Sequence, residues 1–156
     1  MKKTILLVAL MAIVGAATAV AQPRAIGLNL GYGLDVSYQH TIGSSNFIDV
    51  SVNVPCFAGI GATATYDWLN PFGTAIPWNN KGEWNWSLGA GAGLGWAGGF
   101  YVGAVGHAGV SYDFWFPLQL SVDYRPNIGI VAGKGGVSFN TWGLYSGITI
   151  GVRYLF

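Results

Sequence analysis

Histidine and serine are the residues of this chain whose types could support nucleophilic catalysis. A serine hydroxyl becomes a nucleophile when a neighbouring histidine takes its proton and an acid orients that histidine. His107 and Ser111 share one face of an expected strand, but four residues of strand span about 13 Å, far beyond hydrogen-bond reach. His40 and Ser44 fall in an expected turn, and Glu83, the only glutamate, falls in a long loop. The sequence therefore predicts no catalytic residue.

The remaining groups that could bind a metal or a cofactor are few and poorly spaced. The chain has two histidines and one cysteine, Cys56, without the ligand spacing of a zinc site. A single cysteine excludes an intramolecular disulfide, and we expect Cys56 to be a small apolar side chain. Gly91, Gly93 and Gly95 lie mid-strand with no helix after them, so they do not indicate a nucleotide loop. We expect no metal and no cofactor.

Charged side chains within the expected strands share odd-numbered positions, while the even positions are apolar. If such strands cross a membrane, an arginine on the lipid face at mid-depth would cost roughly 2–4 kcal/mol, and an aspartate somewhat less. Facing inward, the charges can pair, which offsets their desolvation. We therefore predict a hydrogen-bonded polar core that fills a barrel lumen; a path for ions or protons is the competing interpretation. The predicted core residues are Asp35, Asp49, Asp67, His107, Asp123, Arg125 and Arg153.

The elements that must position these residues are long alternating strands. From Leu144 to Phe156, apolar residues occupy most even positions and small or polar residues the odd ones, which is the period of a strand. About a dozen residues is long for a soluble domain, but it suits a tilted strand that crosses a bilayer, which needs roughly 9–11. Further strands are expected over residues 24–40, 47–54, 59–68, 84–96, 100–112 and 118–124, and the longest loops over residues 69–83 and 133–143.

The composition also favours a membrane barrel. Charged residues make up 8% of the chain, against about 25% in ordinary soluble domains, and the mean hydropathy is +0.44. Beyond the N-terminal segment no run of 18 apolar residues occurs, so spanning helices are not expected. Without Lys2 and Lys3 the chain has 5 basic and 6 acidic residues, a net charge of −1. This balance leaves no basic surface for nucleic acid.

Residues 1–21 have the pattern of a secretory signal peptide. A positively charged start precedes an apolar stretch over residues 5–17 and a small-residue cleavage site at residues 19–21. An uncleaved membrane anchor is the alternative, but the apolar stretch is short for a spanning helix. We expect cleavage after Ala21, which leaves residues 22–156 as one barrel domain.

Three segments resemble the small eight-stranded barrels of the outer-membrane protein A and X type. Residues 109–126 (GVSYDFWFPLQLSVDYRP) resemble their periplasmic hairpin, in which a strand ending in aromatics turns tightly and returns through an apolar–polar strand toward Arg-Pro. Residues 38–53 (YQHTIGSSNFIDVSVN) resemble the same hairpin. The end of the chain is similar to the C-terminal assembly signal of these barrels, carried here by Ile150, Val152, Tyr154 and Phe156.

The resemblance implies a bacterial outer-membrane location, contact with outer-membrane lipid and lipopolysaccharide, recognition by the barrel-assembly machinery, and a monomer. It is specific for architecture, since such folds carry many unrelated functions. We expect a non-enzymatic integral barrel with a structural or surface-interaction role. The alternatives are a lipid A-modifying enzyme of the deacylase type, whose His-x-Ser pattern is absent around His107 and His40, and a narrow pore.

The strand count depends on residues 24–40. A turn at residues 31–33 makes them a hairpin and gives eight strands, an even number that brings both termini to one side. If they form one strand, residues 126–139 must supply the eighth. We prefer the hairpin, and either count gives an all-β, eight-stranded, antiparallel up-and-down transmembrane barrel filled by its own side chains. The hairpin places residues 133–143 outside and, against the usual rule of short periplasmic turns, residues 69–83 on the periplasmic side.

Overall fold

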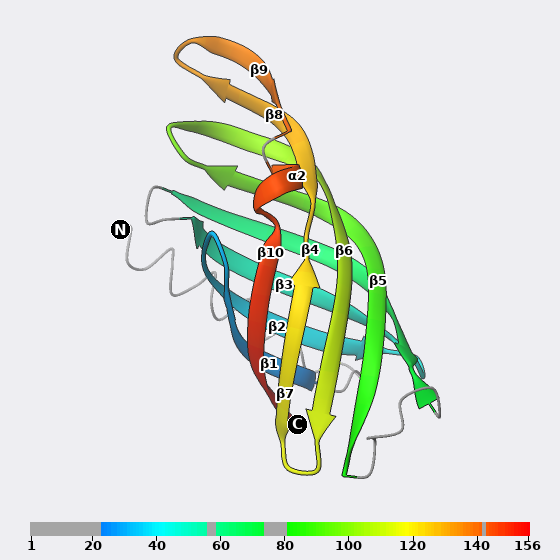
Figure 1. Ribbon diagram of the computed structural model, residues 1–156. Helices are drawn as coiled ribbons and strands as arrows, with labels where there is room; N and C mark the ends of the chain where they lie inside the picture. The colour runs from blue at the N-terminus through cyan, green and yellow to red at the C-terminus, as the bar shows by residue number, and fades with distance from the viewer. Residues whose placement is uncertain (1–22, 56–58, 74–80, 142) are drawn as a thin grey trace.

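The computed structural model describes residues 23–55, 59–73, 81–141 and 143–156 (Figure 1). The predicted signal peptide and Cys56 lie outside the described residues. The fold is all-β with almost no helix, as predicted. The elements are β1 (Pro23–Leu30), β2 (Gly33–Ile42), β3 (Asn46–Pro55), β4 (Ile60–Pro71), β5 (Gly82–Trp96), β6 (Gly99–Phe114), β7 (Leu118–Tyr124), β8 (Asn127–Gly133), β9 (Gly136–Asn140), α2 (Gly143–Ser146) and β10 (Ile148–Leu155). Among the described residues, no helix is long and apolar enough to cross a membrane.

The strands close into an eight-stranded antiparallel barrel, which confirms the predicted fold class. Each strand from β1 to β6 pairs with the next along the chain, and β10 pairs with both β1 and β7. The barrel closes between the first and last strands, where Ala25 lies opposite Leu155 and Leu30 opposite Ile150. The predicted hairpin over residues 24–40 is also confirmed, because β1 and β2 are antiparallel partners joined at Gly31 and Tyr32.

Strands β7 and β8 occupy one position in the wall, one after the other. The first half of β6 (from Gly99) pairs with β8, and its second half (to Asp113) pairs with β7. The interruption falls at Arg125 and Pro126, since proline has no N–H to give to a ladder. The Arg125 N–H donates instead to the Gly147 carbonyl at 2.7 Å, and the Gly106 N–H donates to the Pro126 carbonyl at 2.8 Å.

Residues 133–143 do not form the predicted loop. β8 and β9 make a hairpin that projects beyond the barrel wall, with Gly133 opposite Gly136 at its tip (Figure 1). The predicted strand over residues 144–156 is also too long, because residues 143–146 form α2 and β10 begins at Ile148. The alternation of Leu144 with its neighbours thus belongs to a helical turn that follows β9 and precedes β10.

The two ends of the barrel differ. The end where β1 begins and β10 finishes, here the terminal end, also carries the β2–β3, β4–β5 and β6–β7 connections. The opposite end, here the distal end, carries the β1–β2, β3–β4 and β5–β6 connections and the β8–β9 hairpin. The end of β4 at Pro71 and the start of β5 at Gly82 therefore lie on the terminal side, as the hairpin count requires.

From Ala25 onward, odd-numbered residues of the wall face the lumen and even-numbered residues face outward, whereas Arg24 lies at a β-bulge at the start of β1 and contacts the inward residues Gln39 and Asp113. In β10, Arg153 is 1% exposed, whereas Val152 is 47% and Tyr154 53% exposed. In β5 the inward positions from Gly89 to Gly95 are glycines. A Cβ atom on Gly91 would collide with the Ala64 carbonyl and the Thr65 backbone of β4, so this wall needs glycine to keep its close approach.

We predict that Gly91→Val destabilises the barrel by about 1–3 kcal/mol or more, because the inward side chain has no space beside β4. Ala92→Val, one residue further and outward, is the matched control and is expected to change stability little. The measurement is the urea unfolding midpoint of each variant in the same detergent. Equal midpoints for the two variants would contradict the inward orientation of residue 91.

Candidate functional site: the barrel lumen

The lumen is divided along its axis into three parts. The terminal cluster consists of Arg24 and Asp113 with their neighbours. The central network crosses the middle of the barrel and contains Asp49, Asp67, His107, Asp123, Arg125 and Arg153. The distal cavity occupies the remaining length and opens at the distal end. Each part is built from residues of several strands, and the charged members of the central network are all odd-numbered.

Arg125 anchors the distal side of the central network. Its two terminal nitrogens donate to both carboxylate oxygens of Asp49, at 3.3 and 2.9 Å, and one of them also donates to the Ser51 hydroxyl at 2.7 Å. Such a two-pronged arrangement is the strong form of a charge-assisted hydrogen bond. Asp49 is fully buried and also accepts from Ser37 at 3.1 Å and from Gln39 at 3.0 Å. The loop residue Arg125 is thereby fixed to β3.

Arg153 links the two ends of the chain. It donates to Asp123 at 2.9 Å and to the side-chain oxygen Oδ1 of Asn29 at 2.9 Å. Ser37, Gln119 and Ser121 accept its other N–H groups. These partners lie on β1, β2 and β7, so a single guanidinium on β10 joins strands far apart in sequence. With 1% exposure, it is among the largest fully buried side chains among the described residues.

His107 lies between two carboxylates. Its Nδ1 is 2.5 Å from Asp67 Oδ1, and its Nε2 is 3.1 Å from Asp123 Oδ1. A carboxylate only accepts hydrogen bonds, so this geometry is satisfied when both ring nitrogens carry protons. Thr65 and Ser121 donate to the outer oxygens of the two carboxylates, both at 2.7 Å. The imidazole therefore bridges β4 and β7 across the lumen.

The central network is electrically balanced. Three carboxylates, those of Asp49, Asp67 and Asp123, face two guanidinium groups and the doubly protonated imidazole of His107. Removing charges from water is costly, and pairing with full hydrogen bonding is what makes their burial tolerable. Strand β5 gives this network space rather than a side chain, because a Cβ on Gly89 would collide with the Asp67 carboxylate.

The terminal cluster closes the lower lumen less tightly. Arg24 is 3.5 Å from Asp113, and these two side chains are 16% and 20% exposed. Asp113 also accepts from Gln119 at 2.7 Å and from Asn85 at 3.2 Å. Arg24 lies over the ring of Phe47, with its guanidinium carbon 5.2 Å from the ring centre.

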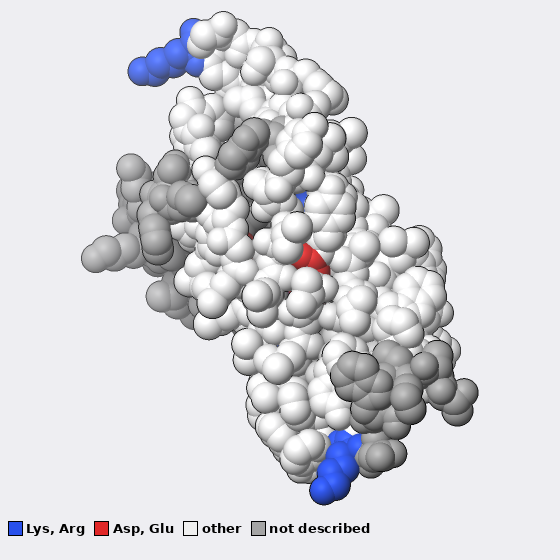
Figure 2. All heavy atoms as spheres, in the orientation of Figure 1, with Lys and Arg blue, Asp and Glu red and all other residues white. Residues whose placement is uncertain are grey.

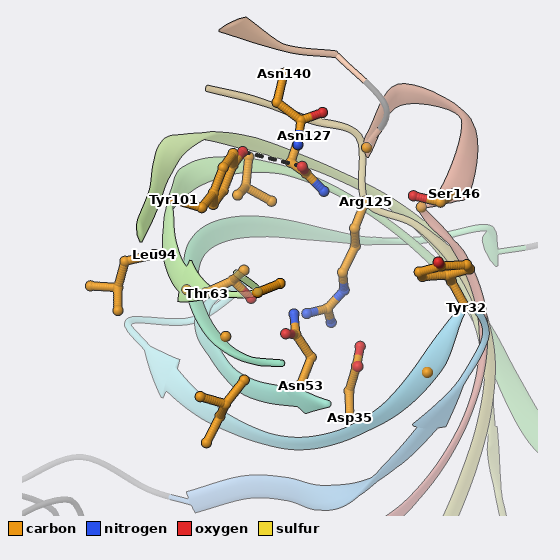
Figure 3. Close-up of a pocket in the computed structure, with 18 of the residues that line it drawn as sticks. Tyr32, Asp35, Asn53, Thr63, Leu94, Tyr101, Arg125, Asn127, Asn140 and Ser146 are labelled. Atoms are coloured by element: carbon orange, nitrogen blue, oxygen red, sulfur yellow. Dashed lines mark hydrogen bonds between the residues drawn. The ribbon is translucent and has the colours of Figure 1, made fainter. Parts of the chain in front are cut away.

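The distal cavity is a correction to the expectation that side chains fill the whole lumen. It has a volume of about 380 Å³ and is lined by residues of β2, β3, β4, β5, β6, β8, β9, α2 and β10 (Figure 3). Its floor is the Arg125 side chain, which reaches across the cavity toward Asp35 and Asn53. Asp35, predicted as a core residue, thus lines the cavity. It forms no ion pair within 4.0 Å with any described residue.

The other six predicted core residues lie together in the central network, each at most 7% exposed. Sequence reasoning missed the neutral groups that complete their hydrogen bonds, although they share the same odd parity. These are Asn29, Ser37, Gln39, Ser51, Thr65, Gln119 and Ser121. The predicted assembly-signal residues Ile150, Val152, Tyr154 and Phe156 face outward and are 47–67% exposed.

No catalytic or metal-binding arrangement is found among the described residues. Each ring nitrogen of His107 contacts a carboxylate, and Ser111 lies opposite Ser121 of β7. The described residues hold no group of three or more His, Cys, Asp or Glu side chains that could coordinate a metal ion.

Comparison of the chain with known protein families, with curated proteins and with solved structures finds no match.

We predict that Arg153→Met lowers the free energy of unfolding by about 3–5 kcal/mol, because it leaves Asp123 buried without a guanidinium partner. Arg24→Met removes a partly exposed ion pair and is expected to cost about 1 kcal/mol or less. Urea titration of both variants in one detergent measures the difference. A similar loss in the two variants would show that the central network does not dominate stability.

Proposed function

We propose that this chain is an integral outer-membrane β-barrel protein without enzymatic activity, whose sealed lumen makes it a structural or surface-contact element of the envelope. The observation that carries this proposal is the outward surface of the barrel. Every charged residue in the described strands either faces the lumen or lies at a strand end. A wall of this kind is suited to hydrocarbon rather than to water.

The apolar outward face of strand β5 has the height that a bilayer-spanning strand needs. Its outward face carries Trp84 and Trp96 near its two ends and only apolar residues between them. Twelve residues of strand cover about 40 Å, which corresponds to roughly 30 Å of height at a barrel tilt of about 40°. This height matches the hydrocarbon core of a bilayer, about 30 Å.

Aromatic side chains gather near both the terminal and the distal end of the barrel. On the terminal side Trp84, Tyr112, Phe114, Trp115 and Phe116 form a chain of ring contacts, and Tyr154 packs against Phe156. On the distal side Trp96 lies opposite Phe100. Indole and phenol rings favour the boundary between hydrocarbon and headgroups. Figure 2 shows basic side chains at the two extremes of the visible face and a broad surface with little charge between them.

The central network supports the absence of a pore and of catalysis. Its ion pairs span the lumen from β3 to β10, where a conducting path would need continuous water. His107 is committed to Asp67 and Asp123, so it is not poised to activate a serine. In this proposal the network blocks the lumen.

In this proposal the terminal end of the barrel, with the start of β1 and the end of β10, faces the periplasm, and the distal end faces outward. The β8–β9 hairpin then projects from the cell surface, with Val137 and Phe139 74% and 67% exposed. Outer-membrane lipid and lipopolysaccharide contact the wall, and the barrel-assembly machinery reads the outward residues of β10. The protein acts as a monomer, since the wall is closed without a second copy.

We predict that the mature chain requires detergent for solubility, migrates differently on gels before and after heating, and shows no discrete conductance steps in planar bilayers. Overexpression is expected to leave the acyl pattern of lipid A unchanged, and His107→Ala to give the same pattern. Solubility without detergent would overturn the membrane assignment. Conductance steps altered by Asp123→Ala would instead favour a pore, and an altered acyl pattern lost in His107→Ala would favour an enzyme.

A further inference from the structure

The distal cavity has the size and enclosure of a small-molecule site. Its volume of about 380 Å³ falls within the range of roughly 300–1,000 Å³ that such sites occupy. The Arg125 side chain of the central network forms its floor, and the cavity lies at the distal end of the lumen. Figure 3 shows Tyr101 and Tyr32 on opposite sides of the Arg125 side chain.

Two buried polar atoms on the lining have no hydrogen-bond partner among the described residues. They are Nε of Arg125 and Oγ1 of Thr149, on residues that are 7% and 8% exposed. Buried polar groups in folded proteins are almost always hydrogen-bonded. Asp49 and Ser51 accept from three of the five N–H groups of Arg125, so the N–H of Nε and the second N–H of Nη2 are not used in these bonds.

The charge of the cavity selects among ligand classes. The guanidinium of Arg125 is already paired with Asp49, whereas Asp35 has no cation within 4.0 Å among the described residues. An anion would therefore meet an unpaired carboxylate, and a cation would meet the free N–H of a guanidinium. A neutral hydroxyl group suits both, because it accepts from Arg125 and donates to Asp35.

The rest of the lining also mixes donors and acceptors. Asn53 carries an amide that does both, and Thr63 and Thr149 carry hydroxyl groups that do both. The Tyr101 hydroxyl donates to Asn127 Oδ1 at 3.1 Å, which holds this ring on one side of the cavity. Aromatic rings offer flat apolar faces beside these polar groups. Polar edges and an apolar face together are the complement of a sugar ring.

We propose that the distal cavity binds a neutral polyhydroxylated ligand, a monosaccharide or the end unit of an oligosaccharide, that enters from the distal end. Asp35 and Asn53 bind its hydroxyl groups, and Arg125 donates through an N–H group that Asp49 and Ser51 do not take. This inference goes beyond the proposed function, because a sealed structural barrel needs no ligand. Binding in detergent does not depend on which membrane holds the protein.

The test is saturation-transfer NMR and calorimetry on the mature chain in detergent, with D-glucose, D-galactose and N-acetyl-D-glucosamine as probes. Saturable binding of at least one sugar is expected, weakened about tenfold or more in Asp35→Asn and in Asn53→Ala. Asp113→Asn, the same change at the opposite end of the lumen, is the control and is expected to bind as the wild type does.

Heat-dependent gel mobility of each variant reports folding separately, so lost binding in a folded variant is informative. The proposal fails if none of the three sugars saturates the protein, or if Asp35→Asn and Asp113→Asn bind equally. Stronger binding of inorganic phosphate or of an alkylammonium ion than of any sugar would also overturn it. None of these results would alter the membrane and conductance tests of the barrel itself.

Discussion

The constraint behind this structure is that a charge inside a narrow barrel must find its partner on another strand. An eight-stranded lumen has room for side chains but not for bulk water, so solvation has to come from the protein. Arg153 on β10 and Arg125 after β7 meet this condition by binding Asp123 and Asp49. Residues separated by 76 to 124 positions are hydrogen-bonded as a result, from Arg125–Asp49 to Arg153–Asn29. The same bonds that make the charges tolerable hold the cylinder closed.

Much of the fold was predictable from parity, because inward and outward residues alternate with a period of two. Parity identifies Asp67 and His107 as inward residues, but it does not give their height along the axis, which the strand register sets. Their contact, and the neutral partners such as Asn29, therefore could not be foreseen. Residues 133–143 were misassigned because glycines at a hairpin tip have the composition of a loop. Leu144 is predicted to begin the last strand but belongs to α2. The prediction is wrong because alternation over three residues does not distinguish a strand end from a helical turn.

The interruption at Arg125 and Pro126 explains why one part of the lumen is filled by side chains and another part holds a cavity. Below it, β7 pairs with both β6 and β10, and the lumen is filled. Above it, β8 pairs with β9 instead of β10. The short helix α2 contacts β8 and leads the chain into β10. The proline removes one ladder N–H, and Arg125 leaves the strand line to reach down to Asp49. A single dipeptide thus ends the regular wall and supplies the floor of the distal cavity.

The central network and the distal cavity need charged residues for different reasons. The central network is neutral as a unit, so each of its charged members is needed for the others to remain buried. Asp35 stands outside that balance, on a lining that is open to solvent at one end. No described cation lies within 4.0 Å of it, so it forms no close ion pair that would hold two strands together. A carboxylate kept in such a position, above a guanidinium with a free Nε, is better explained by contact with a bound molecule than by stability.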